Sequence, residues 1–130
     1  MSKQEKLLGR GYIFGLGAFR RYKETTGHDI GHFEEALTGS IDQVEANYRW
    51  AVMLKCANDV HCSINGGEPI SIDEFTVLLD GAEQEESNKI VNQYLESNYM
   101  GKPMRDYYGI PKAEAAKKKP SPRAKPTSRR

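Results

Sequence analysis

The sequence is poor in cysteine and has no long apolar run, and these absences argue against a disulfide-rich protein and against a membrane-spanning one. Two cysteines, Cys56 and Cys62, in a chain of 130 residues are too few for a disulfide framework and favour a reducing compartment such as the cytoplasm. No apolar run approaches the roughly 20 residues that a transmembrane helix needs, so no membrane span is predicted. The polar start, Met1–Lys6, is not followed by an apolar signal segment, so we do not expect secretion.

Motifs of catalysis and of cofactor binding are also missing. The sequence has no Gly-x-Ser-x-Gly turn and no Gly-Lys-Ser/Thr phosphate loop. The clustered glycines Gly9 and Gly11 are followed by Phe14 at the place where a dinucleotide-binding motif needs its third glycine. We therefore predict that the protein is not an enzyme and that it binds no cofactor.

Histidine and cysteine are too scarce and too widely spaced to predict a metal site. His28 and His32 are four residues apart and would share a face of a helix, with further candidate ligands at Cys56, His61 and Cys62. That arrangement requires Gly31 inside the helix. The spacing of the two cysteines also exceeds that of zinc sites, where about two to four residues separate the ligands. We expect surface histidines, half-buried cysteines and no bound metal.

A net charge of +1 conceals a strong division of charge along the chain. Residues 1–110 contain 11 Lys and Arg against 17 Asp and Glu, whereas residues 111–130 contain 8 against 1. The second segment has four prolines and no apolar side chain larger than alanine, so it buries too little surface to offset an ordering entropy of about 1–2 kcal/mol per residue. We predict a helical domain over residues 1–110 and a disordered, basic, proline-rich tail over residues 111–130. The tail cations available to an acidic partner or a nucleic acid are Lys117, Lys118, Lys119, Arg123, Lys125, Arg129 and Arg130.

The domain is predicted to be all-α, as a small bundle of about four helices. Two capping boxes, Ser40–Gln43 and Ser71–Glu74, mark helix starts. In a capping box the serine oxygen accepts the backbone amide of the residue three places on, and the side chain of that residue accepts the backbone amide of the serine. The apolar spacing predicts helices over 15–26, 40–62, 71–80 and 84–99, and one short turn over 32–37. Residues 12–14 are the only candidate strand.

The predicted helix over 40–62 carries two apolar stripes on opposite sides. The first stripe consists of Ile41, Val44, Tyr48, Ala51 and Val52. The second stripe consists of Ala46, Trp50, Met53, Leu54 and Ala57. Because a surface helix has a single stripe, this helix is either the centre of the bundle or has its second stripe covered by a partner, and we favour the central position.

The stretch from Phe14 to Ile30 resembles the opening of the small tail assembly chaperones of long-tailed bacteriophages. Members of that family commonly begin with a phenylalanine and small residues, followed by a helix that ends in an acidic-x-x-Gly turn and an apolar residue. A longer apolar helix, a loop and a short acidic helix come next, and Ser71–Asp80 is similar to the last of these. The likeness extends over roughly residues 12–100 in order and spacing.

The resemblance implies a non-catalytic, all-helical protein made in the host bacterial cytoplasm. Such proteins bind the tape-measure protein, keep its apolar helices from aggregating and recruit tail-tube subunits, and they are typically absent from the mature virion. In many members a ribosomal frameshift adds a domain, and Ala116–Lys119 is compatible with an adenine-rich slippery run. The strongly basic tail departs from the family pattern.

The expected contact surface is the second stripe of the central helix together with two phenylalanines: Phe14, Phe19, Trp50, Met53, Leu54 and Ala57. An apolar groove made by these side chains would accept an amphipathic helix of the tape-measure protein. Two other functions stay open: a small nucleic-acid-associated protein that makes a weak, salt-sensitive contact through its tail, and a helical regulatory partner of another protein. Self-association also stays open.

Overall fold

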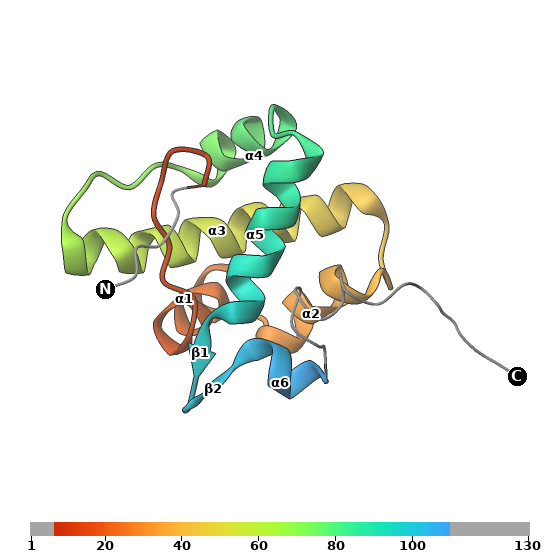
Figure 1. Ribbon diagram of the computed structural model, residues 1–130. Helices are drawn as coiled ribbons and strands as arrows, with labels where there is room; N and C mark the ends of the chain where they lie inside the picture. Colours follow the sequence, from red (N-terminus) through yellow and green to blue (C-terminus); the bar gives the residue numbers. More distant parts are fainter. Residues whose placement is uncertain (1–6, 110–130) are drawn as a thin grey trace, which may run out of the picture.

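Residues 7–109, the part of the chain that a computed structural model describes, form six α-helices and one short hairpin. The helices are α1 (Leu16–Thr26), α2 (Ile30–Thr38), α3 (Gln43–Asn65), α4 (Ile72–Asp80), α5 (Gln84–Glu96) and α6 (Met104–Tyr108). The antiparallel hairpin of β1 (Asn98–Tyr99) and β2 (Lys102–Pro103) lies between α5 and α6. Figure 1 shows α3 as the long central helix, with α4 along one side, α1 and α2 along the other, and α5 crossing it. The all-α prediction is confirmed, while the tail predicted over residues 111–130 lies outside the described residues.

The ends of α3 and α4 follow from local capping, with one correction. α4 begins at the predicted box, where the Ser71 hydroxyl accepts the Glu74 amide and the Glu74 carboxylate accepts the Ser71 amide. The box predicted at Ser40 is wrong: α3 is capped by Asp42, whose carboxylate accepts the amide of Glu45 at 2.8 Å. A carboxylate also gains from the positive end of the helix dipole, which favours Asp42 over the nearby serine hydroxyl.

The remaining boundaries differ from the predictions where tertiary contacts intervene. α2 is a full helix rather than one short turn. α5 ends at Glu96, short of the predicted Tyr99, because the chain turns back through Met100 and Gly101, both with positive φ, into the hairpin. Residues 12–14 form no strand, and the Ile13 amide instead donates to the Ala57 carbonyl of α3 at 3.1 Å.

An aromatic cluster around Tyr94 forms the middle of the core. The Tyr94 ring centroid lies 5.3 Å from that of Phe33, 5.4 Å from that of Phe14 and 5.7 Å from that of Trp50. The Tyr94 side chain is fully buried, and its hydroxyl lies 2.8 Å from the hydroxyl of Tyr108. The cluster therefore joins the loop before α1 with α2, α3, α5 and α6.

The six residues expected at the contact surface all belong to this core, so the expected surface is wrong. Five of them are at most 9% exposed, and the sixth, Trp50, is partly buried between the rings of Phe33 and Tyr94. The reason is that α1 and α2 pack along α3 and Tyr94 of α5 reaches the same side. The residues concerned are Phe14, Phe19, Trp50, Met53, Leu54 and Ala57. Helix α3 is central, as preferred, since α1, α2 and α4 all pack against it.

Candidate functional site

The first half of α3 leaves apolar side chains in solvent. Val44 is 80% exposed and Tyr48 is 47% exposed, whereas Ala51 and Val52, further along the same stripe, are buried. Val44 and Tyr48 are four residues apart and so lie on one face of the helix. The uncovered stripe is therefore the first one, and only in the amino-terminal half of α3.

Val44 and Tyr48 form one wall of a groove, named here the α3–α4 groove. It has a volume of about 310 Å³ and lies between the first half of α3, the second half of α4 and the first turn of α5. Its lining residues are Val44, Asn47, Tyr48, Thr76, Leu79, Asp80 and Ser87. The groove thus combines aliphatic and aromatic surface with one carboxylate, that of Asp80.

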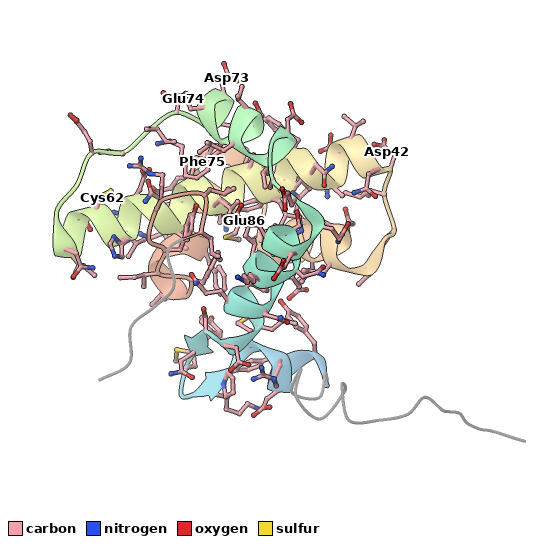
Figure 2. All side chains as sticks on the ribbon, turned by 45° about the horizontal axis from the view of Figure 1, so that its top comes forward. Asp42, Cys62, Asp73, Glu74, Phe75 and Glu86 are labelled. Carbon is pink, nitrogen blue, oxygen red and sulfur yellow. The ribbon has the colours of Figure 1, made fainter. Side chains whose placement is uncertain are left out.

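The sequence of α4 explains how this helix presents one side to the groove. Thr76, Leu79 and Asp80 are three and four residues apart and share a face. Phe75, one turn before Leu79, is fully buried and contacts the Tyr12 ring, which helps to fix α4 to the core. In Figure 2, Phe75 lies on the side of α4 that faces α3, and Asp73 and Glu74 lie on its outer side. Gly81 then ends α4, so that α5 starts three residues later and brings Ser87 to the groove.

A second groove, the α4–loop groove, runs along the other side of α4. Its volume is about 560 Å³, and it is lined by Leu8, Gly9, Arg10, Ile70, Asp73, Glu74, Val77 and Leu78. Hydrogen bonds position the loop: Glu86 accepts the Leu8 amide at 2.8 Å, and the Arg10 guanidinium donates to Asn58 and to the Glu68 carbonyl. Because α4 lines both grooves and Val77 is 68% exposed, apolar surface is accessible along α4 on both of its sides.

Carboxylates dominate the charge around α4. Residues 56–88 contain eight Asp and Glu and no Lys or Arg. Within residues 7–109, none of the carboxylates of Asp73, Asp80, Glu83 and Glu85 forms a salt bridge. The nearby cation Arg49 is 12% exposed and is already bound to Glu35 and Glu45. Of the residues that line the α3–α4 groove, Asp80 is the charged one, and Glu83 and Glu85 follow it in the chain.

The tyrosines and the cysteine with the largest pKa shifts are buried or partly buried by packing. Burial raises the pKa of the Cys56 thiol to about 11, so this thiol stays protonated at neutral pH and is a poor nucleophile. Burial also raises the pKa of Tyr94, and burial together with the nearby Arg49 lowers the pKa of His32. None of these three side chains lines either groove.

The candidate metal ligands do not come together. The rings of His28 and His32 stack with centroids 4.0 Å apart, and the Tyr22 hydroxyl lies 2.8 Å from Nδ1 of His32. His61 is elsewhere, with its ring against Gly11, where a Cβ atom would lie 2.5 Å from Nε2. No group of three or more His, Cys, Asp or Glu side chains within residues 7–109 is arranged to hold a metal ion.

Sequence reasoning placed Val44 and Tyr48 on a stripe but missed the rest of the groove. Leu79 was expected only as an apolar position of its helix, and Asp80 and Ser87 carry no local signal of a site.

The tail cations from Lys117 to Arg130 lie beyond the described residues. Across residues 7–109, no helix has the length and apolar character required to cross a bilayer. No protein-family model matches the chain, and neither a curated protein nor a solved structure is significantly similar to it.

Proposed function

We propose that this protein is a non-catalytic tail assembly chaperone of a long-tailed bacteriophage, which binds the tape-measure protein and recruits tail-tube subunits. The resemblance over roughly residues 12–100 supports the family. The observation that carries the binding role is the α3–α4 groove, because Val44 and Tyr48 remain exposed on a helix whose other stripe is packed in the core. Exposed apolar surface of this kind is typical of sites that accept a partner helix.

In this proposal the groove covers part of the apolar stripe of a tape-measure helix. Val44, Tyr48 and Leu79 would contact apolar side chains that recur every three or four residues along the partner. A groove of about 310 Å³ accepts only a few side chains, so each contact is weak and reversible. Many copies along a long partner would then protect it from aggregation and still be displaced by tail-tube subunits.

The cellular setting follows from the proposed role. The chaperone acts in the host bacterial cytoplasm and is absent from the mature virion. A frameshifted longer form that begins near Ala116–Lys119 would supply the additional domain.

Co-expression with the tape-measure protein of the same phage tests the function. The full-length chain should co-purify with the tape-measure protein and increase the soluble fraction of that protein. The double variant Val44→Ser/Tyr48→Ser should lose co-purification, because both changes remove apolar surface from the groove. The matched control is Leu16→Ser/Ile64→Ser, which removes apolar side chains that are 64% and 67% exposed and lie outside the groove.

Two results would contradict the proposal in different ways. A folded wild-type protein that neither co-purifies with the tape-measure protein nor keeps it soluble would exclude the chaperone function. Equal loss of co-purification in the test variant and the control variant would show that the α3–α4 groove is not the binding site. Circular dichroism of each variant establishes that the helices are intact.

Nucleic-acid binding through the tail is the second candidate, and the excess of seven positive charges over residues 111–130 favours it. Lys and Arg side chains release counterions when they neutralise phosphates, so retention on DNA should fall steeply with salt. Binding should also weaken when Lys117, Lys118 and Lys119 are changed to glutamine, because fewer cations remain to neutralise phosphates. The acidic domain opposes this function, because it repels a polyanion.

A further inference from the structure

The α3–α4 groove has a mixed lining, in which Val44, Tyr48 and Leu79 supply the apolar surface and the other four residues are polar or charged. Asp80 lines the groove directly. Glu83, the N-cap residue of α5, follows Asp80 by three residues and precedes Ser87, which lines the groove, by four. Neither the Asp80 nor the Glu83 carboxylate has a hydrogen-bond or salt-bridge partner within residues 7–109.

Helix capping accounts for only part of this negative charge. The amino terminus of a helix carries roughly half a positive charge, which one carboxylate satisfies. The start of α5 has three carboxylates, those of Glu83, Glu85 and Glu86, and Asp80 precedes them in α4. Glu86 already accepts the Leu8 amide, whereas Asp80 and Glu83 have no partner within residues 7–109 and can pair with a positively charged ligand.

We infer that the occupant of the α3–α4 groove is a cationic amphipathic helix: an apolar stripe flanked by Lys or Arg. This inference rests on the proposed function, since it names the kind of tape-measure segment that the chaperone binds. The apolar stripe lies against Val44, Tyr48 and Leu79, and the flanking cations lie beside Asp80 and Glu83. Charge complementarity of this kind selects the partner and speeds its association.

The other occupants fit the groove less well. The chain's own basic tail matches the negative charge of Asp80 and Glu83, but the apolar residues over 111–130 are alanine and proline, without a large aliphatic or aromatic side chain to fill the lining. A second copy of the chain would place the same acidic surface against itself in a symmetric dimer, and like charges at an interface are unfavourable. A nucleic acid is repelled by the same carboxylates.

A pair of model peptides tests the inference on the full-length protein. Both are fluorescently labelled amphipathic helices of about 18 residues, or five turns, with leucine on one face and either lysine or glutamate on the other. Fluorescence anisotropy should show that the leucine–lysine peptide binds at least about tenfold more tightly than the leucine–glutamate peptide. Raising the salt from about 50 mM to about 500 mM should weaken that binding, because salt screens exposed charges.

Matched variants separate the groove from general attraction to an acidic protein. Asp80→Asn/Glu83→Gln should weaken binding of the leucine–lysine peptide about tenfold. The control Glu24→Gln/Asp29→Asn makes the same change in net charge at exposed carboxylates outside the groove, and should leave binding nearly unchanged. Val44→Ser/Tyr48→Ser should weaken binding, and Leu16→Ser/Ile64→Ser should not.

Several results would overturn the inference. Equal binding of the two peptides would do so, as would equal effects of the two charge variants. So would a competition experiment in which a peptide of residues 111–130 displaces the labelled leucine–lysine peptide as readily as the unlabelled leucine–lysine peptide does. Formation of a dimer that Val44→Ser/Tyr48→Ser abolishes would point to a second copy of the chain as the occupant of the groove.

Two further outcomes distinguish this inference from the proposed function. If the tape-measure protein co-purifies equally well with Asp80→Asn/Glu83→Gln, this inference fails and the proposed function stands. If the leucine–lysine peptide binds in the groove but the tape-measure protein does not, the proposed function fails and the preference for a cationic helix stands.

Discussion

At the residue scale, the buried amide of Asn58 holds the loop before α1 against α3. Asn58 is 2% exposed, and its Nδ2 donates to the Gly11 carbonyl at 2.9 Å. Its Oδ1 accepts from Nε of Arg10 at 3.0 Å. Buried polar groups need such partners, because an unpaired one keeps the full cost of losing water.

Replacing Asn58 by alanine should therefore lower the free energy of unfolding by about 1–3 kcal/mol, because the Gly11 carbonyl loses its partner. Urea denaturation followed by circular dichroism measures the change. Asn47→Ala on the exposed side of the same helix is the control and should change the free energy by less than about 0.5 kcal/mol. Similar losses in both variants would contradict the role given to Asn58.

Cys56 gives a second test at this scale. Because burial raises its pKa to about 11, the folded protein holds the thiol proton more tightly than the unfolded chain does. The stability from the protonated thiol is full below about pH 9 and is lost as the pH rises through about 11. At pH 8, iodoacetamide should therefore modify the partly exposed Cys62 well before Cys56, as mass spectrometry of the native protein would show.

Denaturation is the control for this experiment. In urea both cysteines are exposed and should react at similar rates. Equal rates in the native protein would show that Cys56 is not buried as described.

At the scale of elements, α3 has different functions in its two halves. The part from Ala51 onward contains eight of the nine buried residues of α3. The first half is capped by Asp42 and carries Val44 and Tyr48 in solvent. Figure 2 shows Asp42 at the start of this helix and Cys62 towards its other end. The groove lies near the Asp42 end.

The start of α3 can be tested by removing each candidate cap. Asp42→Ala should lower the free energy of unfolding by about 1 kcal/mol, because the Glu45 amide loses its acceptor. Ser40→Ala should have a smaller effect, since the Ser40 hydroxyl bonds the exposed Thr38 hydroxyl and no helix amide among residues 7–109. Thermal and urea unfolding measure both changes, and a larger loss in Ser40→Ala would restore the capping box predicted from the sequence.

At the scale of the whole molecule, one aromatic core supports a surface that is largely acidic. Tyr94 and its neighbours join the loop before α1 to α2, α3, α5 and α6. Phe75 is the fully buried side chain that α4 contributes to the core. The two grooves therefore flank a helix that is anchored by Phe75 and packed through the partly buried Ile72, Leu78 and Leu79. This arrangement separates the residues needed for folding from those proposed to bind.

That separation predicts opposite outcomes for the two stripes of α3. Leu54→Ala should lower the free energy of unfolding by about 2–5 kcal/mol, because Leu54 is fully buried. Val44→Ala should leave it within about 0.5 kcal/mol, because Val44 is 80% exposed. Denaturation experiments on both variants provide the test, and a stable, well-folded Leu54→Ala variant would show that this stripe is not core.

The sequence alone determined the features that depend on neighbouring residues. A helix is closed by hydrogen bonds between residues four apart, so periodicity, the Ser71 capping box and Gly27 located α1, α4 and most of α3 and α5. The two stripes of α3 were visible for the same reason. Tertiary structure decided which stripe is covered, because that depends on segments far apart in the chain: Phe14, Phe33 and Tyr94 converge on one side, while Leu79 and Ser87 reach only the edge of the other. Helical spacing tells which side chains share a face, but only packing of distant segments tells which face meets water.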